Sequence, residues 1–242
     1  MRKTILSVFL ILTLAFAWIP SFAASTPASL TAVNTYTDIK GHWAEKAIVS
    51  YAEQAIFADS TGKFLPSKSI TRSEFVLMLH KALGISIQYF KAIDIKEYFS
   101  DVNNGDRYAY ALYDLATLGI IDYRGTFRPN ETLPRDEMVH IIINALKNKL
   151  GGTLPVNTKM PIILRDDAQI SAAFKSDVYR ALLLNLIYGR GNNQFDPKTR
   201  TTRAESAVMM ERLVAAVKRL TPKVGVAASA VPGQIGLLMK YE

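Results

Sequence analysis

The sequence predicts an all-α fold of three helix-loop-helix repeats in a pseudo-threefold arrangement around a central helical bundle. The first observation is a phrase that recurs at 70–74 (Ile-Thr-Arg-Ser-Glu), 133–137 (Leu-Pro-Arg-Asp-Glu) and 201–205 (Thr-Thr-Arg-Ala-Glu). Each copy follows a turn ending in Phe-x-Pro, with six residues from that proline to the arginine every time. Apolar residues at helical spacing accompany each copy. Such an internal repeat sets the architecture of the chain.

Residues 1–23 have the pattern of a secretory signal peptide. Arg2 and Lys3 precede an apolar run from Ile5 to Ile19, and 21–23 (Ser-Phe-Ala) provides small residues for cleavage. An uncleaved N-terminal anchor is the alternative. No later run approaches membrane-spanning length, so we expect no membrane span after cleavage and a protein secreted to the cell wall or surface.

Composition narrows the class of partner. The chain has no Cys, so an exported protein of this kind must rely on core packing rather than disulfides. Its 29 Lys+Arg against 21 Asp+Glu give a net charge of +8, which favours attraction to anionic envelope polymers. We expect no nucleic-acid partner, because export removes it and the basic residues are dispersed. The three His residues have no Cys or i, i+4 partner, and we expect neither a metal nor a cofactor.

The repeat units are expected at 36–87, 98–150 and 162–220, followed by a flexible tail at 221–242. Gly151, Gly152 and Pro155 mark the clearest linker, between the second and third units. Each unit opens with apolar residues at helical spacing, which predict its first helix. These residues are Trp43, Ala47, Ile48 and Tyr51; Leu112, Leu115 and Ala116; and Val178, Ala181 and Leu182.

The second helix of each unit is predicted to start at the repeated phrase. Thr71 with Glu74, and Thr202 with Glu205, have the spacing of a capping box, worth about 1 kcal/mol per helix. Pro134 replaces the threonine in the middle copy and cannot cap through its side chain. Apolar runs follow at 75–79, 138–143 and 207–210, so these helices should be the most buried elements. Glycines in the preceding loops, Gly62, Gly125, Gly189 and Gly191, are expected to allow positive φ.

The order of these elements resembles the S-layer homology repeat. An Asp precedes Gly-His-Trp-Ala at 41–44, then come a Gly-containing turn, Phe-x-Pro and Thr-Arg-x-Glu, and the likeness covers about residues 36–218. The resemblance implies non-covalent anchoring to an acidic, often pyruvylated, secondary cell-wall polysaccharide at the bacterial surface, in grooves between repeats. Carried over to this sequence, the glycan-binding candidates are Asp38, Trp43, Arg72, Asp101, Tyr108, Arg135, Asp166, Gly189 and Arg203.

Physical chemistry supports the arginines as ligand contacts. A guanidinium matches a carboxylate bidentately, and a helix N-terminus also favours an anion. One such contact is worth roughly 1.5–3 kcal/mol. The same arginines can instead pair with Asp or Glu across the repeat boundaries, and between the three we favour Arg72 and Arg203 over Arg135 as glycan contacts. Asp38, Asp101 and Asp166 can equally hold turns, and Trp43 can belong to the core.

No catalytic residue is expected. Glycosidases need two placed carboxylates, but the capping-box spacing already explains Glu74 and Glu205. Ser73 and Ser206 have no nucleophile elbow or nearby His. Because no large cargo module accompanies the repeats, a structural scaffold that binds itself or other surface proteins is the alternative to glycan binding.

Overall fold

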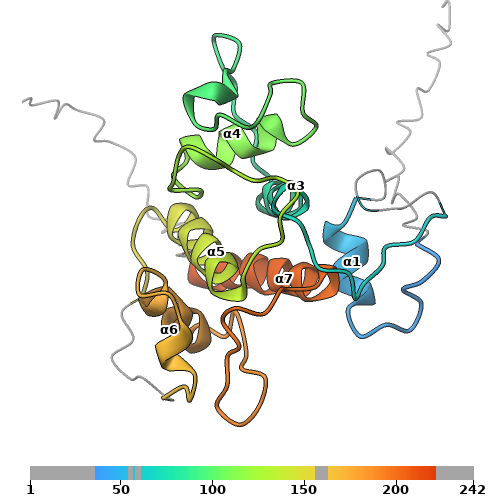
Figure 1. The fold of residues 1–242 in the computed structure, drawn as a ribbon, viewed down its shortest axis with the longest axis vertical. Coiled ribbons are helices and arrows are strands. Elements are labelled where there is room, and N and C mark those ends of the chain that lie inside the picture. The colour runs from blue at the N-terminus through green and yellow to red at the C-terminus, as the bar shows by residue number, and fades with distance from the viewer. Residues whose placement is uncertain (1–35, 54–56, 58–60, 156–162, 222–242) are drawn as a thin grey trace, which may run out of the picture. The chain divides into compact units, whose positions relative to one another are not determined.

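The structure, a computed structural model, describes residues 36–53, 57, 61–155 and 163–221, and there its regular elements are helices (Figure 1). The first helices of the repeats are α1 (Glu45–Tyr51), α4 (Ala109–Thr117) and α6 (Lys175–Leu183). The second helices are α3 (Arg72–Leu83), α5 (Arg135–Lys149) and α7 (Arg203–Leu220). Two short 3-10 helices span Ile95–Glu97 and Asp167–Gln169. The all-α prediction is therefore confirmed, whereas the predicted signal peptide at 1–23 and residues 222–242 of the predicted tail lie outside the described residues.

The second helices form the shared core. Helix α7 packs against α3 and α5, and the first helices cover this group (Figure 1). Each first helix packs on the second helix of the preceding repeat: α4 on α3, α6 on α5, and α1 on α7. The phenylalanines of the three Phe-x-Pro turns, Phe64, Phe127 and Phe195, are fully buried beneath them. Burying a side chain of this size contributes about 1.5–3 kcal/mol, so the repeated turns help to hold the core together.

The sequence caps the second helices as predicted. The Thr71 hydroxyl accepts a hydrogen bond from the Glu74 amide (3.3 Å), and the Glu74 carboxylate accepts one from the Thr71 amide (3.1 Å). Thr202 and Glu205 repeat this capping box at the start of α7. Helix α5 begins after Pro134 without a side-chain cap. Both predicted capping boxes are thus confirmed.

Backbone hydrogen bonds join the three repeats in a closed cycle. The first amide of each second helix donates to a carbonyl in the loop before the second helix of the next repeat, which satisfies a group that the helix itself leaves unpaired. The pairs are Arg72 to Glu131 (2.8 Å), Arg135 to Thr199 (3.1 Å) and Arg203 to Lys68 (2.8 Å). Each arginine of the repeated phrase therefore lies at a boundary between two repeats. The pseudo-threefold symmetry itself stays a prediction.

Candidate functional site

The three arginines of the repeated phrase are buried side chains at the repeat boundaries. Arg72, Arg135 and Arg203 are only 2%, 5% and 4% exposed. Each guanidinium lies over the turn phenylalanine of the next repeat, with its central carbon 5.5 Å from the ring of Phe127, 5.1 Å from Phe195 and 5.8 Å from Phe64, respectively. A buried guanidinium is costly unless its charge and donors are satisfied, so its remaining partners decide what each boundary can do.

At two boundaries the guanidinium forms an ion pair with a carboxylate of a neighbouring repeat. Arg72 Nη2 donates to Glu137 Oε1 at 2.6 Å and to the Tyr123 hydroxyl. Arg203 donates through Nη2 and Nε to both carboxylate oxygens of Glu74. Its Nη1 donates to the backbone carbonyls of Phe57 and Phe64. These two arginines hold neighbouring repeats together.

Arg135 has a different environment. Its Nη2 donates to the Tyr188 carbonyl at 2.8 Å, and among the described residues its buried Nε, like that of Arg72, has no hydrogen-bond partner. Across residues 36–53, 57, 61–155 and 163–221, no carboxylate lies within ion-pair distance of this side chain. Burial, followed by the nearby Arg190 charge, lowers the pKa of Arg135 to about 10. Its guanidinium is therefore cationic at neutral pH and lacks a paired anion.

A small pocket of about 160 Å³ surrounds Arg135 and draws on all three repeats. Trp43 of the first repeat lines it and is 67% exposed. The third repeat adds Tyr188 and Arg190 from its loop and Arg212 from α7, whose guanidinium carbon lies 4.4 Å from the centre of the Tyr188 ring. Glu205 also lines the pocket and is paired with Arg190 at 2.7 Å. Three cationic groups against this one carboxylate, beside exposed aromatic rings, suit a small carboxylate carried on a group with a flat apolar face.

The three predicted aspartates hold the Phe-x-Pro turns. In each repeat the carboxylate accepts hydrogen bonds from the amides of the turn phenylalanine and of the residue after it, whose φ is positive. The Asp38 bonds to Phe64 and Leu65 are both 2.8 Å, and those from Asp101 to Phe127 and Arg128 are both 2.7 Å. Asp166 binds Phe195 and Asp196 at 3.0 and 2.6 Å. These contacts match the turn-holding alternative.

Tyr108 and Gly189 have separate positions. Tyr108 precedes α4, and its hydroxyl donates to Asp106 at 3.3 Å, away from the Arg135 pocket lining. Burial raises the pKa of Tyr108 to about 12. Gly189 lines the pocket, but the expectation of positive φ was wrong for it, although Gly191 has φ of 92°. A Cβ on Gly189 would lie 2.8 Å from the Gln194 carbonyl oxygen, so a close backbone approach requires the glycine.

Three pocket residues escaped the sequence analysis: Tyr188, Arg190 and Arg212. They lie outside the repeated phrase, so the repeat register did not mark them. The clearest signal that was available is the third loop itself, in which Arg190 stands between Gly189 and Gly191 and seven positions separate Tyr188 from Phe195.

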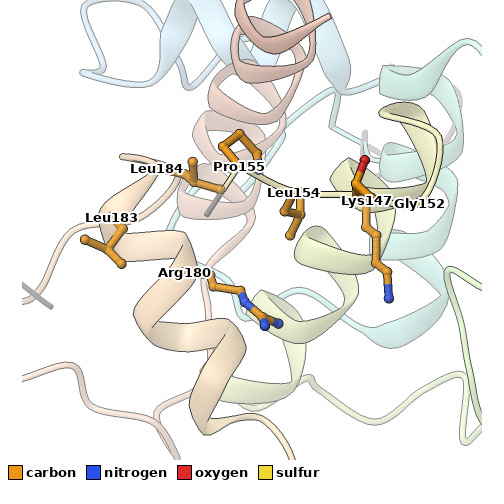
Figure 2. Close-up of a pocket in the computed structure, with 8 residues that line it drawn as sticks. Lys147, Gly152, Leu154, Pro155, Arg180, Leu183 and Leu184 are labelled. Carbon is orange, nitrogen blue, oxygen red and sulfur yellow. The ribbon is translucent and has the colours of Figure 1, made fainter. Parts of the chain in front are cut away.

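A larger pocket of about 410 Å³ lies where the linker between the second and third repeats meets α5 and α6 (Figure 2). Leu154 and Pro155 line it together with Leu184 and with the basic side chains of Lys147 and Arg180 (Figure 2). Arg180 is already paired with Asp177 at 3.1 Å, and no aromatic side chain lines the pocket. Its size alone does not make it the better anion site.

Two other kinds of site, for a metal ion and for a membrane, concern the described residues. Within the described ranges, no group of three or more His, Asp or Glu residues is arranged to hold a metal ion. No helix in that part of the chain is both long and apolar enough to cross a bilayer.

Comparison with known proteins gives a consistent family. The sequence model of the S-layer homology domain matches three times, at residues 35–76, 98–139 and 165–207. The exoglucanase XynX of Acetivibrio thermocellus is 34% identical over 189 residues, which are 74% of this chain and 16% of that protein. The cellulosome-anchoring protein of the same species is 33% identical over 132 residues, which are 53% of this chain and 30% of that protein. The S-layer protein sap of Bacillus anthracis is 28% identical over 178 residues (72% and 20%). The alignments thus cover less than a third of each relative.

Proposed function

Because this chain belongs to the S-layer homology family, we propose that it binds an acidic, pyruvylated secondary cell-wall polysaccharide at the boundary between its second and third repeats. Membership places the chain at the bacterial cell surface, where such domains anchor proteins. The observation that carries the proposal is Arg135, a buried cation beside the exposed Trp43 that forms no ion pair with a carboxylate of the described residues. The role is one of binding rather than catalysis.

The chemistry of the pocket suits a pyruvyl ketal on a sugar. Its carboxylate would supply the anion that Arg135 lacks, and its ring would lie against the aromatic face of Trp43 or Tyr188. A charge-assisted hydrogen bond of this kind contributes roughly 1.5–3 kcal/mol. The partner anion also offsets the penalty of burying the guanidinium, so binding and burial reinforce each other.

This assignment reverses the order favoured from the sequence. Arg72 and Arg203 are engaged by Glu137 and Glu74, and an acidic sugar would have to displace these carboxylates. The proposed site leaves out the turn-holding Asp38, Asp101 and Asp166 and also Tyr108, which does not line the pocket. Trp43 and Gly189 remain in it with Arg135.

The test is binding of the purified chain to wall fragments of defined pyruvylation. We expect Arg135→Gln to weaken binding by about 10- to 100-fold, following the strength of a charge-assisted contact. Arg128→Gln is the matched control, because Arg128 is an exposed arginine of the second Phe-x-Pro turn, outside the pocket lining. Trp43→Ala should also weaken binding, and because the Trp43 side chain is 67% exposed we expect this variant to remain folded.

Two results would overturn the proposal: unchanged binding by Arg135→Gln, or equal binding to fragments stripped of pyruvate. Circular dichroism and thermal melting establish that each variant is folded. The scaffold alternative predicts self-association that persists after wall glycan is removed, which light scattering detects.

A further inference from the structure

We propose that Arg190 keeps Arg135 available to a ligand by pairing with Glu205, which lines the same pocket, and so holding that carboxylate off the Arg135 guanidinium. Arg190 would then be the positioning residue that determines which repeat boundary can accept a ligand. The inference rests on the proposed function for the identity of the ligand, but the ion-pair arrangement behind it is independent of any glycan.

The three boundaries differ in the destination of one glutamate. The first turn of each second helix carries a glutamate: Glu74 in α3, Glu137 in α5 and Glu205 in α7. At the first two boundaries this residue pairs with the buried arginine of the preceding repeat in the cycle, Glu137 with Arg72 and Glu74 with Arg203. By the same pattern Glu205 would pair with Arg135. It pairs instead with Arg190, at 2.7 Å.

Local helix geometry does not explain the difference. Glu74 and Glu205 both form capping boxes, in which one carboxylate oxygen accepts from the amide of the preceding threonine, at 3.1 Å from Thr71 and 2.9 Å from Thr202. The other oxygen is then available to a neighbouring cation. In Glu74 it binds the buried Arg203, and in Glu205 it binds Arg190. The competing cation is therefore what distinguishes the open boundary.

The third loop is built to deliver that cation. Seven positions separate Tyr188 from Phe195 and likewise Phe57 from Phe64 in the first repeat, whereas four separate Tyr123 from Phe127 in the second repeat. Five positions before its phenylalanine, the third loop has Arg190 and the first has Asp59. The Arg190 amide donates to the Gln194 carbonyl at 2.8 Å, which fixes the loop where Gly189 allows a close backbone approach.

The second repeat has an arginine in its shorter loop, but this side chain is committed elsewhere. Arg124 donates to the Glu97 carbonyl at 2.7 Å and lies 4.3 Å from the centre of the Tyr98 ring. It therefore does not compete with Arg72 for Glu137. An arginine in a short loop is therefore not sufficient, and neither is a long loop without an arginine, because the first loop is as long as the third but has Asp59 at the position of Arg190.

Arg190 also has an electrostatic effect on the pocket. It and Arg212 add positive charge around Arg135, while the negative charge of Glu205 is held on Arg190. Removing the Arg190 cation would free the second oxygen of Glu205, and Arg135 is the buried cation in the same pocket that lacks a carboxylate. The pocket would then resemble the two internally paired boundaries.

The experiment compares four chains for binding to pyruvylated wall fragments: native, Arg190→Lys, Arg190→Gln and the double variant Arg190→Gln/Glu205→Gln. We expect Arg190→Gln to lower affinity about tenfold or more, because Glu205 competes with the ligand for Arg135. Arg190→Lys keeps a cation for Glu205 and should retain most of the affinity. The double variant should recover binding, since Gln keeps the capping box but carries no charge. A double variant as weak as Arg190→Gln would overturn the inference, because Arg190 would then contact the ligand directly.

Thermal melting without glycan, with Glu205→Gln alone as a fifth chain, separates this inference from the proposed function. Glu205→Gln should lower the melting temperature more in the Arg190→Gln background than in the native chain, because it then leaves Arg135 without its new partner. If this coupling is present but no chain binds the fragments, the proposed function fails and the role of Arg190 stands. If the native chain binds but both the coupling and the rescue are absent, the role of Arg190 is refuted and the proposed function stands.

Discussion

Glu137→Gln tests whether the buried ion pairs at two of the repeat boundaries stabilise the fold. The Glu137 carboxylate lies 2.6 Å from Arg72 Nη2, and the two side chains are 17% and 2% exposed. Glutamine keeps a neutral acceptor, so the change replaces a charge-assisted bond of roughly 1.5–3 kcal/mol by a neutral one of roughly 0.5–1.5 kcal/mol. Loss of the negative charge in the first turn of α5 also removes its favourable interaction with the helix dipole, which lowers the free energy of unfolding by a further 0.3–1 kcal/mol, roughly. We expect a loss of about 2 kcal/mol in the free energy of unfolding.

Chemical and thermal denaturation measure this loss. For a chain of this size, about 2 kcal/mol corresponds to a fall of about 4–8 °C in melting temperature. The control is Glu131→Gln, which breaks the Arg128–Glu131 pair, where the two side chains are 53% and 61% exposed. Such a surface pair is worth less than about 1 kcal/mol. Equal destabilisation by the two variants would refute the reasoning, because burial of the Arg72 pair would then make no difference.

Two further predictions concern pH and helix capping. Burial opposes the charged form of His140, but hydrogen bonds to Asp177 (2.7 Å) and Asp122 raise its pKa, so its stabilising effect is present at low pH and is lost as pH rises through the folded-state pKa. The difference in melting temperature between the native chain and His140→Gln should therefore shrink from pH 5.5 to pH 9, roughly the range around an ordinary histidine pKa. A difference that stays constant over this range would contradict a stabilising role of the charged His140. Thr202→Ala should destabilise the chain by about 1 kcal/mol through loss of the α7 cap. Thr221→Ala, at the exposed far end of the same helix, is its control, and an equal effect would argue against the cap.

The sequence predicted the features that are encoded locally. Thr71 and Glu74 are three residues apart, so their capping box depends only on the start of one helix. The Phe-x-Pro turns and the buried second helices likewise follow from short spacings and apolar runs. These elements repeat in register, which made them recognisable in three copies.

The partners of the arginines were not predictable in the same way. Arg72, Arg135 and Arg203 occupy the same position in the phrase, yet their environments differ because their partners come from another repeat. The Arg135 environment depends on Arg190, which is 55 positions further along the chain. Glu205 binds Arg190, a side chain of one loop that has no counterpart in the repeated phrase, so no periodic signal marks this pair.

The way in which neighbouring repeats share their contacts also constrains how such proteins can change length. Each first helix rests on the previous copy, and the start of each second helix is completed by a loop of the following one, with α1 resting on α7. Unlike a linear solenoid, which grows at its ends, this architecture offers no free end for a fourth unit. Duplication or deletion of a single repeat would leave the backbone amides at one helix N-terminus unpaired and one apolar helix face uncovered. We therefore expect such chains to gain or lose repeats three at a time.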